Sequence, residues 1–247
     1  GAKKRQNAAV LGLRPNFIGT RMSKKSLLIF DLDGTLIDSV PDLANAVNAT
    51  LADLGRDTFR EDTIRHWVGN GASVLMARAL SGNTQIDAAL PAELTQQALA
   101  LFFNHYRTHA CQQTRAYEGV TKGLTQLKAA YTLAIVTNKP AEFVPNILTN
   151  LGWQGLFRKV LGGDSLPTKK PDPAPLLHVC QQLGFSTAQS YMIGDSKNDI
   201  LAGKNAGIDT LAVSYGYNYG EDIRQSEPTH TFDDFGALTE FLSHARV

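Results

Sequence analysis

The feature that most constrains this chain is an unbroken apolar run that ends in two aspartates. Leu27–Phe30 is followed directly by Asp31, then by Asp33 one residue later and by Gly34. Such a run predicts a strand of a parallel sheet that is buried on both faces. Because an unpaired buried carboxylate is costly, the two aspartates must lie at the carboxyl end of that strand. Ligands bind at this edge in open α/β sheets.

The order of the predicted elements indicates a doubly wound α/β fold. Residues 41–112 show helical periodicity and no strand pattern, whereas strands and helices alternate from there to the end of the chain. Alternation of this kind predicts a mostly parallel sheet. We therefore predict an α/β core, residues 22–40 and 113–247, with an all-helical domain, residues 41–112, inserted after the first strand. The expected helices lie at residues 41–54, 61–68, 74–80, 91–109, 120–130, 141–151, 173–183, 199–206 and 235–243, and the later strands at 132–137, 159–163, 191–195, 210–214 and 230–232.

Charge and cysteine content narrow the classes of protein that fit. The chain has 24 basic and 23 acidic residues, and residues 1–21 carry basic side chains without an acid. We interpret residues 1–21 as a basic tail, an expression remnant or an over-extended start, and a targeting peptide or a nucleic-acid-binding arm is the alternative. Nothing in the rest of the chain indicates nucleic acid, so we expect no nucleic-acid partner. No apolar run approaches the roughly 20 residues of a membrane helix, so we expect no membrane partner. Cys111 and Cys180 lack the spacing of a metal site or a disulfide framework, which favours a cytoplasmic location. We expect a monomer or a homodimer.

Polar residues follow several of the predicted strands. Thr137 comes at the end of the second, and Asp195 follows a later one, with Asp199 at the start of the next helix. If these strands lie next to the first strand in the sheet, their carboxyl ends bring these residues close to Asp31 and Asp33. The resulting cluster of carboxylate oxygens suits Mg²⁺, which commonly keeps waters and binds phosphate oxygens. Thr137 and the backbone beyond it, including Asn138, would bind a phosphoryl group. Lys170, in a loop stiffened by prolines, would offset the negative charge.

These elements resemble the motifs of the haloacid dehalogenase superfamily, in the order that the family requires. The resemblance covers about residues 27–243 and implies that the inserted helices form the family's small cap. The match is Asp31–Thr35 for the first motif, Thr137 for the second, Lys170 for the third, and Asp195 with Asp199 for the fourth.

The resemblance also implies a role for each of these residues. Asp31 would be the nucleophile that forms an aspartyl phosphate, and Asp33 would protonate the leaving alcohol and then activate water. The implied Mg²⁺ ligands are an Asp31 carboxylate oxygen, the Asp33 backbone carbonyl and Asp195. Asp199 would orient Lys170 or a water on the metal.

Asp33 indicates the type of reaction, and the inserted helices indicate the substrate. The family's dehalogenases characteristically lack an aspartate at the position of Asp33, so its presence favours hydrolysis of a small phosphate ester. Residues 30–39, and 68–71 with 78–80, are similar to bacterial phosphoglycolate phosphatases, which implies 2-phosphoglycolate as the substrate. The backbone amides of Gly69, Asn70 and Gly71 would bind its anionic groups. The alternatives are a sugar-phosphate phosphatase, a β-phosphoglucomutase-like phosphotransferase and, more distantly, a non-catalytic binding protein.

Overall fold

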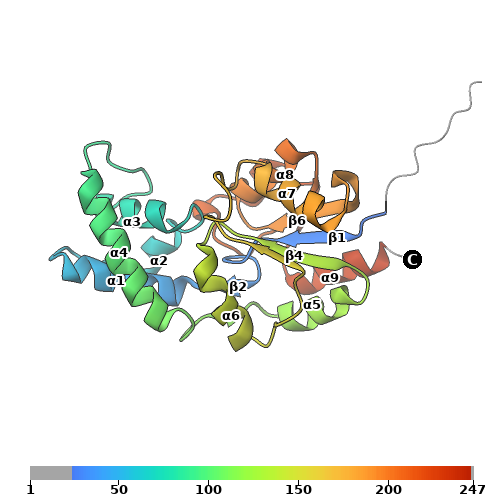
Figure 1. The fold of residues 1–247 in the computed structure, drawn as a ribbon, viewed down its shortest axis with the longest axis horizontal. Coiled ribbons are helices and arrows are strands. Elements are labelled where there is room, and N and C mark those ends of the chain that lie inside the picture. The colour runs from blue at the N-terminus through green and yellow to red at the C-terminus, as the bar shows by residue number, and fades with distance from the viewer. Residues whose placement is uncertain (1–23, 246–247) are drawn as a thin grey trace, which may run out of the picture.

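A parallel sheet forms the centre of the molecule. The computed structural model describes residues 24–245, so the predicted basic tail lies outside the described residues. The sheet has six strands in the order β5-β4-β1-β6-β7-β8, and each neighbouring pair is parallel (Figure 1). The first strand therefore lies between β4 and β6, as the prediction of converging strand ends requires. The strands are β1 (Leu27–Phe30), β4 (Thr132–Val136), β5 (Lys159–Leu161), β6 (Ser190–Gly194), β7 (Asp209–Val213) and β8 (His230–Phe232).

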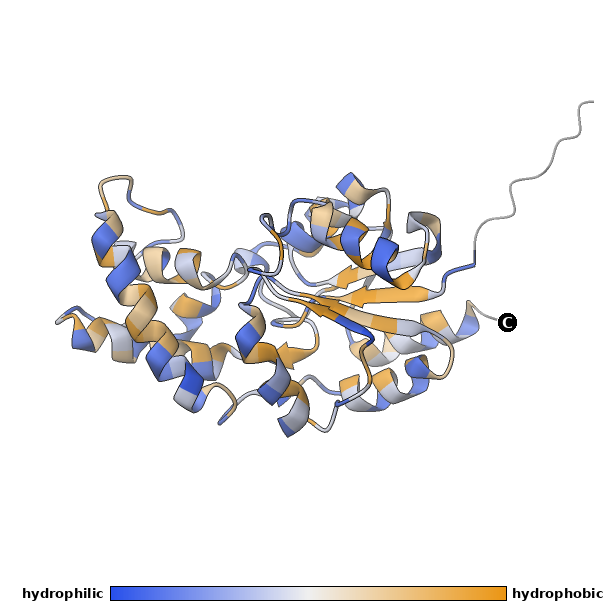
Figure 2. Cartoon of the chain, in the orientation of Figure 1, coloured by the Kyte–Doolittle hydropathy of each residue, from blue (hydrophilic) through white to orange (hydrophobic). Residues whose placement is uncertain are grey.

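Helices cover both faces of this sheet, and β1 shows why. Leu28 and Phe30 pack into one apolar cluster and Leu27 and Ile29 into another, because side chains alternate along a strand. The strands are apolar where the helices cover them (Figure 2). The predicted α/β fold is thus confirmed. One face is covered by α5 (Val120–Lys128), α6 (Val144–Asn150) and α9 (Phe235–His244), and the other by α7 (Ala174–Leu183) and α8 (Lys197–Ala206).

Four further helices form a block beside the core (Figure 1). They have an apolar cluster of their own, in which Leu51, Trp67, Met76 and Phe102 are buried. We call these helices the helical block. It consists of α1 (Val40–Asp53), α2 (Glu61–Arg65), α3 (Ala72–Ser81) and α4 (Ala92–His109).

The two connections between the block and the core lie side by side. They form a short antiparallel pair, β2 (Ile37–Asp38) with β3 (Arg115–Ala116). At the start of α1, the Asp42 carboxylate accepts hydrogen bonds from the backbone N–H groups of Gln113 and Thr114, at 2.9 and 2.8 Å. The beginning and the end of the helical block are therefore held together at the point where both leave the core.

The structure differs from the sequence prediction in a few local elements. The β2–β3 pair was not predicted, because two residues per strand are too few to show a period. The helix expected at 61–68 ends at Arg65, since the chain then turns toward Gly69 and Gly71, which both have positive φ. The helix expected from residue 199 already begins at Lys197. The helix expected at 141–151 begins as a 3₁₀ turn, η1 (Ala141–Phe143), before α6. Three further 3₁₀ turns were missed, namely η2 (Thr187–Gln189), η3 (Asn218–Gly220) and η4 (Ile223–Ser226).

Two further predictions concern thiols and membranes. Cys111 and Cys180 are both free thiols. Among the helices of residues 24–245, none combines the length and the apolar character that crossing a membrane requires.

Candidate active site

The first strand delivers its two aspartates to the carboxyl edge of the sheet. Asp31 still bonds to β6, through its N–H and the carbonyl of Ile193, at 2.9 Å. The chain then turns sharply at Gly34, whose φ is +87°. A Cβ atom at Gly34 would overlap the carboxylate of Asp195, so the turn can approach that carboxylate only because the residue is glycine.

A buried lysine lies between two aspartates on one side of the site. Lys170 Nζ is 3.1 Å from Asp31 Oδ1 and 2.7 Å from Asp199 Oδ1, and the lysine side chain is only 1% exposed. Burial alone would lower the pKa of Lys170, but the Asp199 and Asp31 carboxylates outweigh burial and raise it. The ammonium therefore stays charged and is shared by both carboxylates.

The fourth motif is held in place by hydrogen bonds to both of its carboxylates. Asp199 Oδ2 accepts the backbone N–H groups of Asp195 and Ser196, each at 3.1 Å, which caps the start of α8. Asp195 Oδ1 accepts the Thr35 hydroxyl at 2.9 Å, and Oδ2 accepts the Tyr217 N–H at 2.8 Å. The carboxylate of Asp195 is thus fixed beside the first motif.

A second buried lysine, which sequence reasoning missed, lies against Asp33. Lys139 Nζ is 2.6 Å from Asp33 Oδ1, and Ser39 donates its hydroxyl to the same oxygen. The ring of Tyr106, from α4, has its centroid 5.0 Å from the nitrogen. Burial alone would lower the pKa of Lys139, yet the Asp33 carboxylate more than compensates and raises it. The only feature of the sequence that could have pointed to Lys139 is its position two residues after Thr137, the residue that matches the second motif.

The acidic residues of this edge fit a hard divalent cation. Carboxylate oxygens of Asp31, Asp195 and Asp199 all lie within 4.8 Å of one another. Burial, and next the charge of Asp199, raise the pKa of Asp31 and raise that of Asp195 to about 7. With Asp33, four acidic side chains face two lysines, so this group has two more acidic side chains than basic ones. Oxygen ligands with excess negative charge are what Mg²⁺ binds.

The two polar residues after β4 lie at the same edge in different surroundings. Thr137 Oγ1 accepts the backbone N–H of Lys139 at 3.1 Å, so its own hydroxyl proton stays available. The Asn138 amide instead joins parts of the chain, donating to the carbonyls of Gly69 at 3.0 Å and Lys170 at 2.9 Å. Its buried Oδ1 has no hydrogen-bond partner among residues 24–245.

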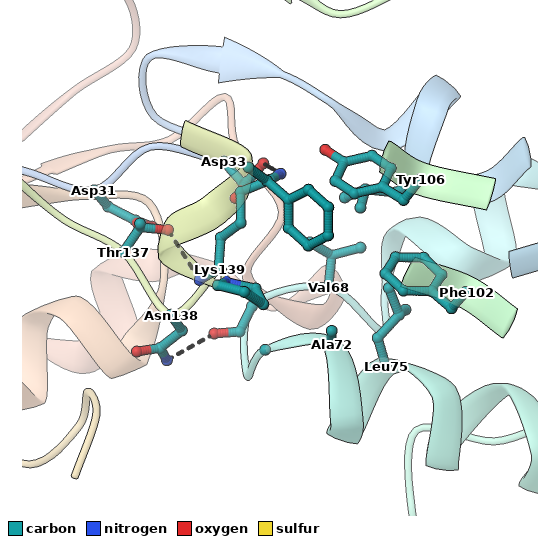
Figure 3. A pocket seen from close by; sticks show the side chains of 15 residues that line it. Asp31, Asp33, Val68, Ala72, Leu75, Phe102, Tyr106, Thr137, Asn138 and Lys139 are labelled. Carbon is teal, nitrogen blue, oxygen red and sulfur yellow. Dashed lines mark hydrogen bonds and ion pairs between the residues drawn. The ribbon is translucent and has the colours of Figure 1, made fainter. Parts of the chain in front are cut away.

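A pocket lies between this edge and the helical block (Figure 3). Its polar end consists of Asp31, Asp33, Thr137, Asn138 and Lys139. Most of the remaining wall is apolar, so the charges are concentrated at the end nearest the sheet. That wall consists of Leu43, Val68, Ala72, Leu75, Phe102, Tyr106, Pro140 and Phe143.

The loop that the sequence assigned to substrate binding lies at the border of this pocket. Gly69 and Gly71 line it, but Asn70 does not. The side-chain oxygen of Asn70 accepts from Arg78 at 2.9 Å and from Tyr219 at 2.6 Å. Lys169 Nζ donates to the Asn70 carbonyl at 2.6 Å. The acceptor atoms of this loop are thus held largely by side chains of the core.

Comparison with known proteins finds one matching family and several similar relatives. The model of the haloacid dehalogenase-like hydrolases matches residues 28–213. The phosphoglycolate phosphatase of Psychrobacter arcticus is 59% identical over 223 residues, covering 90% of this chain and 97% of the relative. That of Colwellia psychrerythraea is 55% identical, covering 88% and 97%. A crystal structure titled as a predicted phosphoglycolate phosphatase from Haemophilus somnus superimposes with a TM-score of 0.82 at 39% identity, covering 89% and 99%.

Proposed function

The chain belongs to the haloacid dehalogenase-like hydrolases, and we propose that it is a Mg²⁺-dependent phosphatase that hydrolyses 2-phosphoglycolate to glycolate and phosphate. One observation carries the proposal: Asp31 and Asp33 lie side by side at the pocket's polar end, each paired with a different buried lysine. Two carboxylates in different surroundings can serve as nucleophile and as acid and base. The named relatives supply the choice of substrate.

In the first step, Asp31 attacks phosphorus and the bond from phosphorus to the glycolate oxygen breaks. The product on the enzyme is an aspartyl phosphate, and Asp33, which enters this step in its protonated form, gives the departing oxygen its proton. In the second step, water attacks the aspartyl phosphate, Asp33 takes a proton from that water, and phosphate leaves. Asp31 and Asp33 end in their starting states, so the cycle balances.

The charges around Asp31 favour this attack. Lys170, held by Asp199 at 2.7 Å, neutralises part of the charge that nucleophile and phosphoryl group bring together. Thr137 has a hydroxyl proton to donate to a phosphoryl oxygen. The apolar wall of the pocket keeps water from the aspartyl phosphate until glycolate has left.

Asp31, Asp195 and the backbone carbonyl of Asp33 would hold Mg²⁺. When bound, the ion would neutralise negative charge on the transferring phosphoryl group. Asp199 stays on Lys170 in this assignment, because its other oxygen is occupied by the N–H groups at the start of α8.

Steady-state rates on a panel of phosphate esters test this function. We expect the highest kcat/KM for 2-phosphoglycolate, with no turnover in EDTA and recovery on adding Mg²⁺. A hexose phosphate turned over faster than 2-phosphoglycolate would instead favour a sugar-phosphate phosphatase, and transfer of the phosphoryl group between sugars would favour a mutase. Turnover that persists in EDTA would contradict the metal assignment.

A further inference from the structure

We infer that Lys139 is the cation that binds the carboxylate of the substrate and so sets the preference for an acidic phosphate ester. The inference rests on the proposed function. It concerns a residue that the motifs do not include and that lines the pocket beside Asp33.

The position of Lys139 follows from the shape of 2-phosphoglycolate. A phosphoryl group within reach of Asp31 brings the bridging oxygen to Asp33, which must protonate it. In 2-phosphoglycolate, a single methylene group separates that oxygen from the carboxylate. Lys139 Nζ lies 2.6 Å from Asp33 Oδ1, on the pocket side of the aspartate (Figure 3). A carboxylate so close to the bridging oxygen therefore reaches the ammonium.

Lys139 also has the capacity to bind a second anion. An ammonium has three N–H donors, and Asp33 accepts one of them. The ring of Tyr106, 5.0 Å from the nitrogen, stabilises the charge without supplying a formal anion. The lysine side chain is 5% exposed, so a carboxylate that reaches it interacts in surroundings of low dielectric constant, where charge pairing is strong.

The other nearby cations are less suited to this task. Lys170 already carries two carboxylates, and Arg65 is paired with Asp38. Lys169 is half-buried, and it donates to the carbonyl of Asn70. Among the described residues that line the pocket, Lys139 alone has a cationic side chain.

The apolar wall of the pocket also supports the inference, because none of the described residues that form it offers a second cationic side chain for the carboxylate of the substrate. Apart from the neutral hydroxyl of Tyr106, which lies beside Lys139, the wall opposite the polar end is built from residues such as Leu43, Phe102 and Phe143, which provide no polar side-chain group for a carboxylate. A buried charge without a partner is strongly disfavoured. An acidic substrate is therefore accepted only if its carboxylate turns toward Lys139.

A matched pair of substrates and a matched pair of variants test the inference. Ethyl phosphate has a methyl group where 2-phosphoglycolate has its carboxylate, so the ratio of their kcat/KM values reports the carboxylate alone. Lys139→Met should lower this ratio at least about 30-fold, because a buried charge pair is lost. Lys169→Met removes the nearby lysine that bonds the glycine loop, and it should leave the ratio within about threefold. If Lys139→Met does not fold, the same loss is expected in Lys139→Gln, which keeps a donor for Asp33.

The outcomes separate this inference from the function on which it rests. An equal loss on both substrates would mean that Lys139 acts only through Asp33, and that would overturn the inference. A drop of the ratio in Lys169→Met, but not in Lys139→Met, would move the carboxylate site to the glycine loop. A wild-type protein that does not prefer 2-phosphoglycolate would refute the proposed function itself, whatever the variants do.

A binding measurement keeps the test free of the chemical step. The unreactive phosphonate 3-phosphonopropionate has the length and charges of the substrate, and propylphosphonate lacks its carboxylate. By calorimetry in Mg²⁺, the wild type should bind 3-phosphonopropionate more tightly, and Lys139→Gln should bind the two about equally. A preference that survives in Lys139→Gln would overturn the inference.

Discussion

The two halves of the site pair the same residue types in different ways. Around Asp31, one lysine, Lys170, is shared by two carboxylates, the second being Asp199. Around Asp33, one lysine, Lys139, has a single carboxylate partner. The first lysine has more negative charge near it than it can neutralise, whereas the second is matched one to one and faces the pocket.

The origin of the surrounding groups explains this difference. Both carboxylates that pair with Lys170 belong to the α/β core, so the charge pairing of the Asp31 half does not involve the helical block. The ring beside Lys139 comes from Tyr106 on α4, and Ser39 lies just before α1. The division suggests that phosphoryl transfer depends on the core, whereas recognition of the rest of the substrate depends on the boundary with the block.

The largest effect should follow from removing the nucleophile of the first half. We expect Asp31→Asn to lower kcat by at least about 10³-fold on every phosphate ester, because the amide cannot form the aspartyl phosphate. Steady-state assays, with circular dichroism as a check of the fold, measure this. Asp57→Asn, which changes an exposed aspartate of the helical block, is the control and should match the wild type. Activity of Asp31→Asn within tenfold of the wild type would exclude Asp31 as the nucleophile.

The next effect contrasts the two lysines directly. Lys170→Met leaves Asp31 and Asp199 without their cation, and loss of one partner from a buried ion pair costs about 3–5 kcal/mol of folding free energy. Lys139→Met leaves a single carboxylate, which still accepts the hydroxyl of Ser39, and should cost about 1–3 kcal/mol. Urea unfolding in EDTA gives both values. If Lys139→Met proves the more destabilising, the comparison of the two halves is wrong.

The sequence predicted the first half of the site much better than the second. Asp31 and Asp195 were found because apolar runs locate the strands, and parallel strands bring their carboxyl ends to one edge. Lys170 was assigned from its proline-containing loop and from the resemblance to the family's third motif. A strand of four apolar residues and a helix ended by glycine are local patterns, so they can be derived without tertiary contacts. The same reasoning gave the α/β core and the helical block.

Asp33 of the second half was predicted, but its lysine partner could not be, because the contacts of Lys139 join distant segments. Lys139 and Tyr106 are 33 positions apart, and nothing in the spacing of a loop lysine and a helix tyrosine shows that they meet. Asn70 was assigned through the backbone amides of its loop, and the structure adds that its oxygen atoms, which that assignment did not use, are held by Lys169 and Tyr219. Which atoms of a loop are occupied depends on the surface packed against it.

A smaller effect concerns Asp195, a proposed Mg²⁺ ligand beside Asp31: the stabilisation of the fold by Mg²⁺ should depend on pH. In the metal-free protein the pKa of Asp195 is raised to about 7 from 3.8, so the folded state holds its proton more tightly than the unfolded chain. This contribution to stability is complete at low pH and is lost as the pH rises from about 4 through 7. Mg²⁺ replaces the proton, and at saturating concentration it should raise Tm by about 5 °C at pH 8. We expect a smaller rise at pH 5.5 in scanning calorimetry, and an equal or larger rise there would contradict the ligand assignment.

The smallest effect should come from the hydroxyl group of the second half. The Tyr106 hydroxyl is buried, and no hydrogen bond to it meets strict geometry among residues 24–245. Lys139 is nevertheless near enough that its charge and a weak hydrogen bond both lower the pKa of this hydroxyl, against the larger effect of burial. Burial raises the pKa of Tyr106 to about 12, so the group is neutral at physiological pH. Tyr106→Phe keeps the ring beside Lys139 and should change the free energy of unfolding by less than about 1 kcal/mol, measured in urea. A loss above about 2 kcal/mol would mean that the hydroxyl bonds the ammonium in the folded protein. Lys139 would then have fewer donors for a substrate carboxylate, and the two halves of the site would be more alike than their contacts indicate.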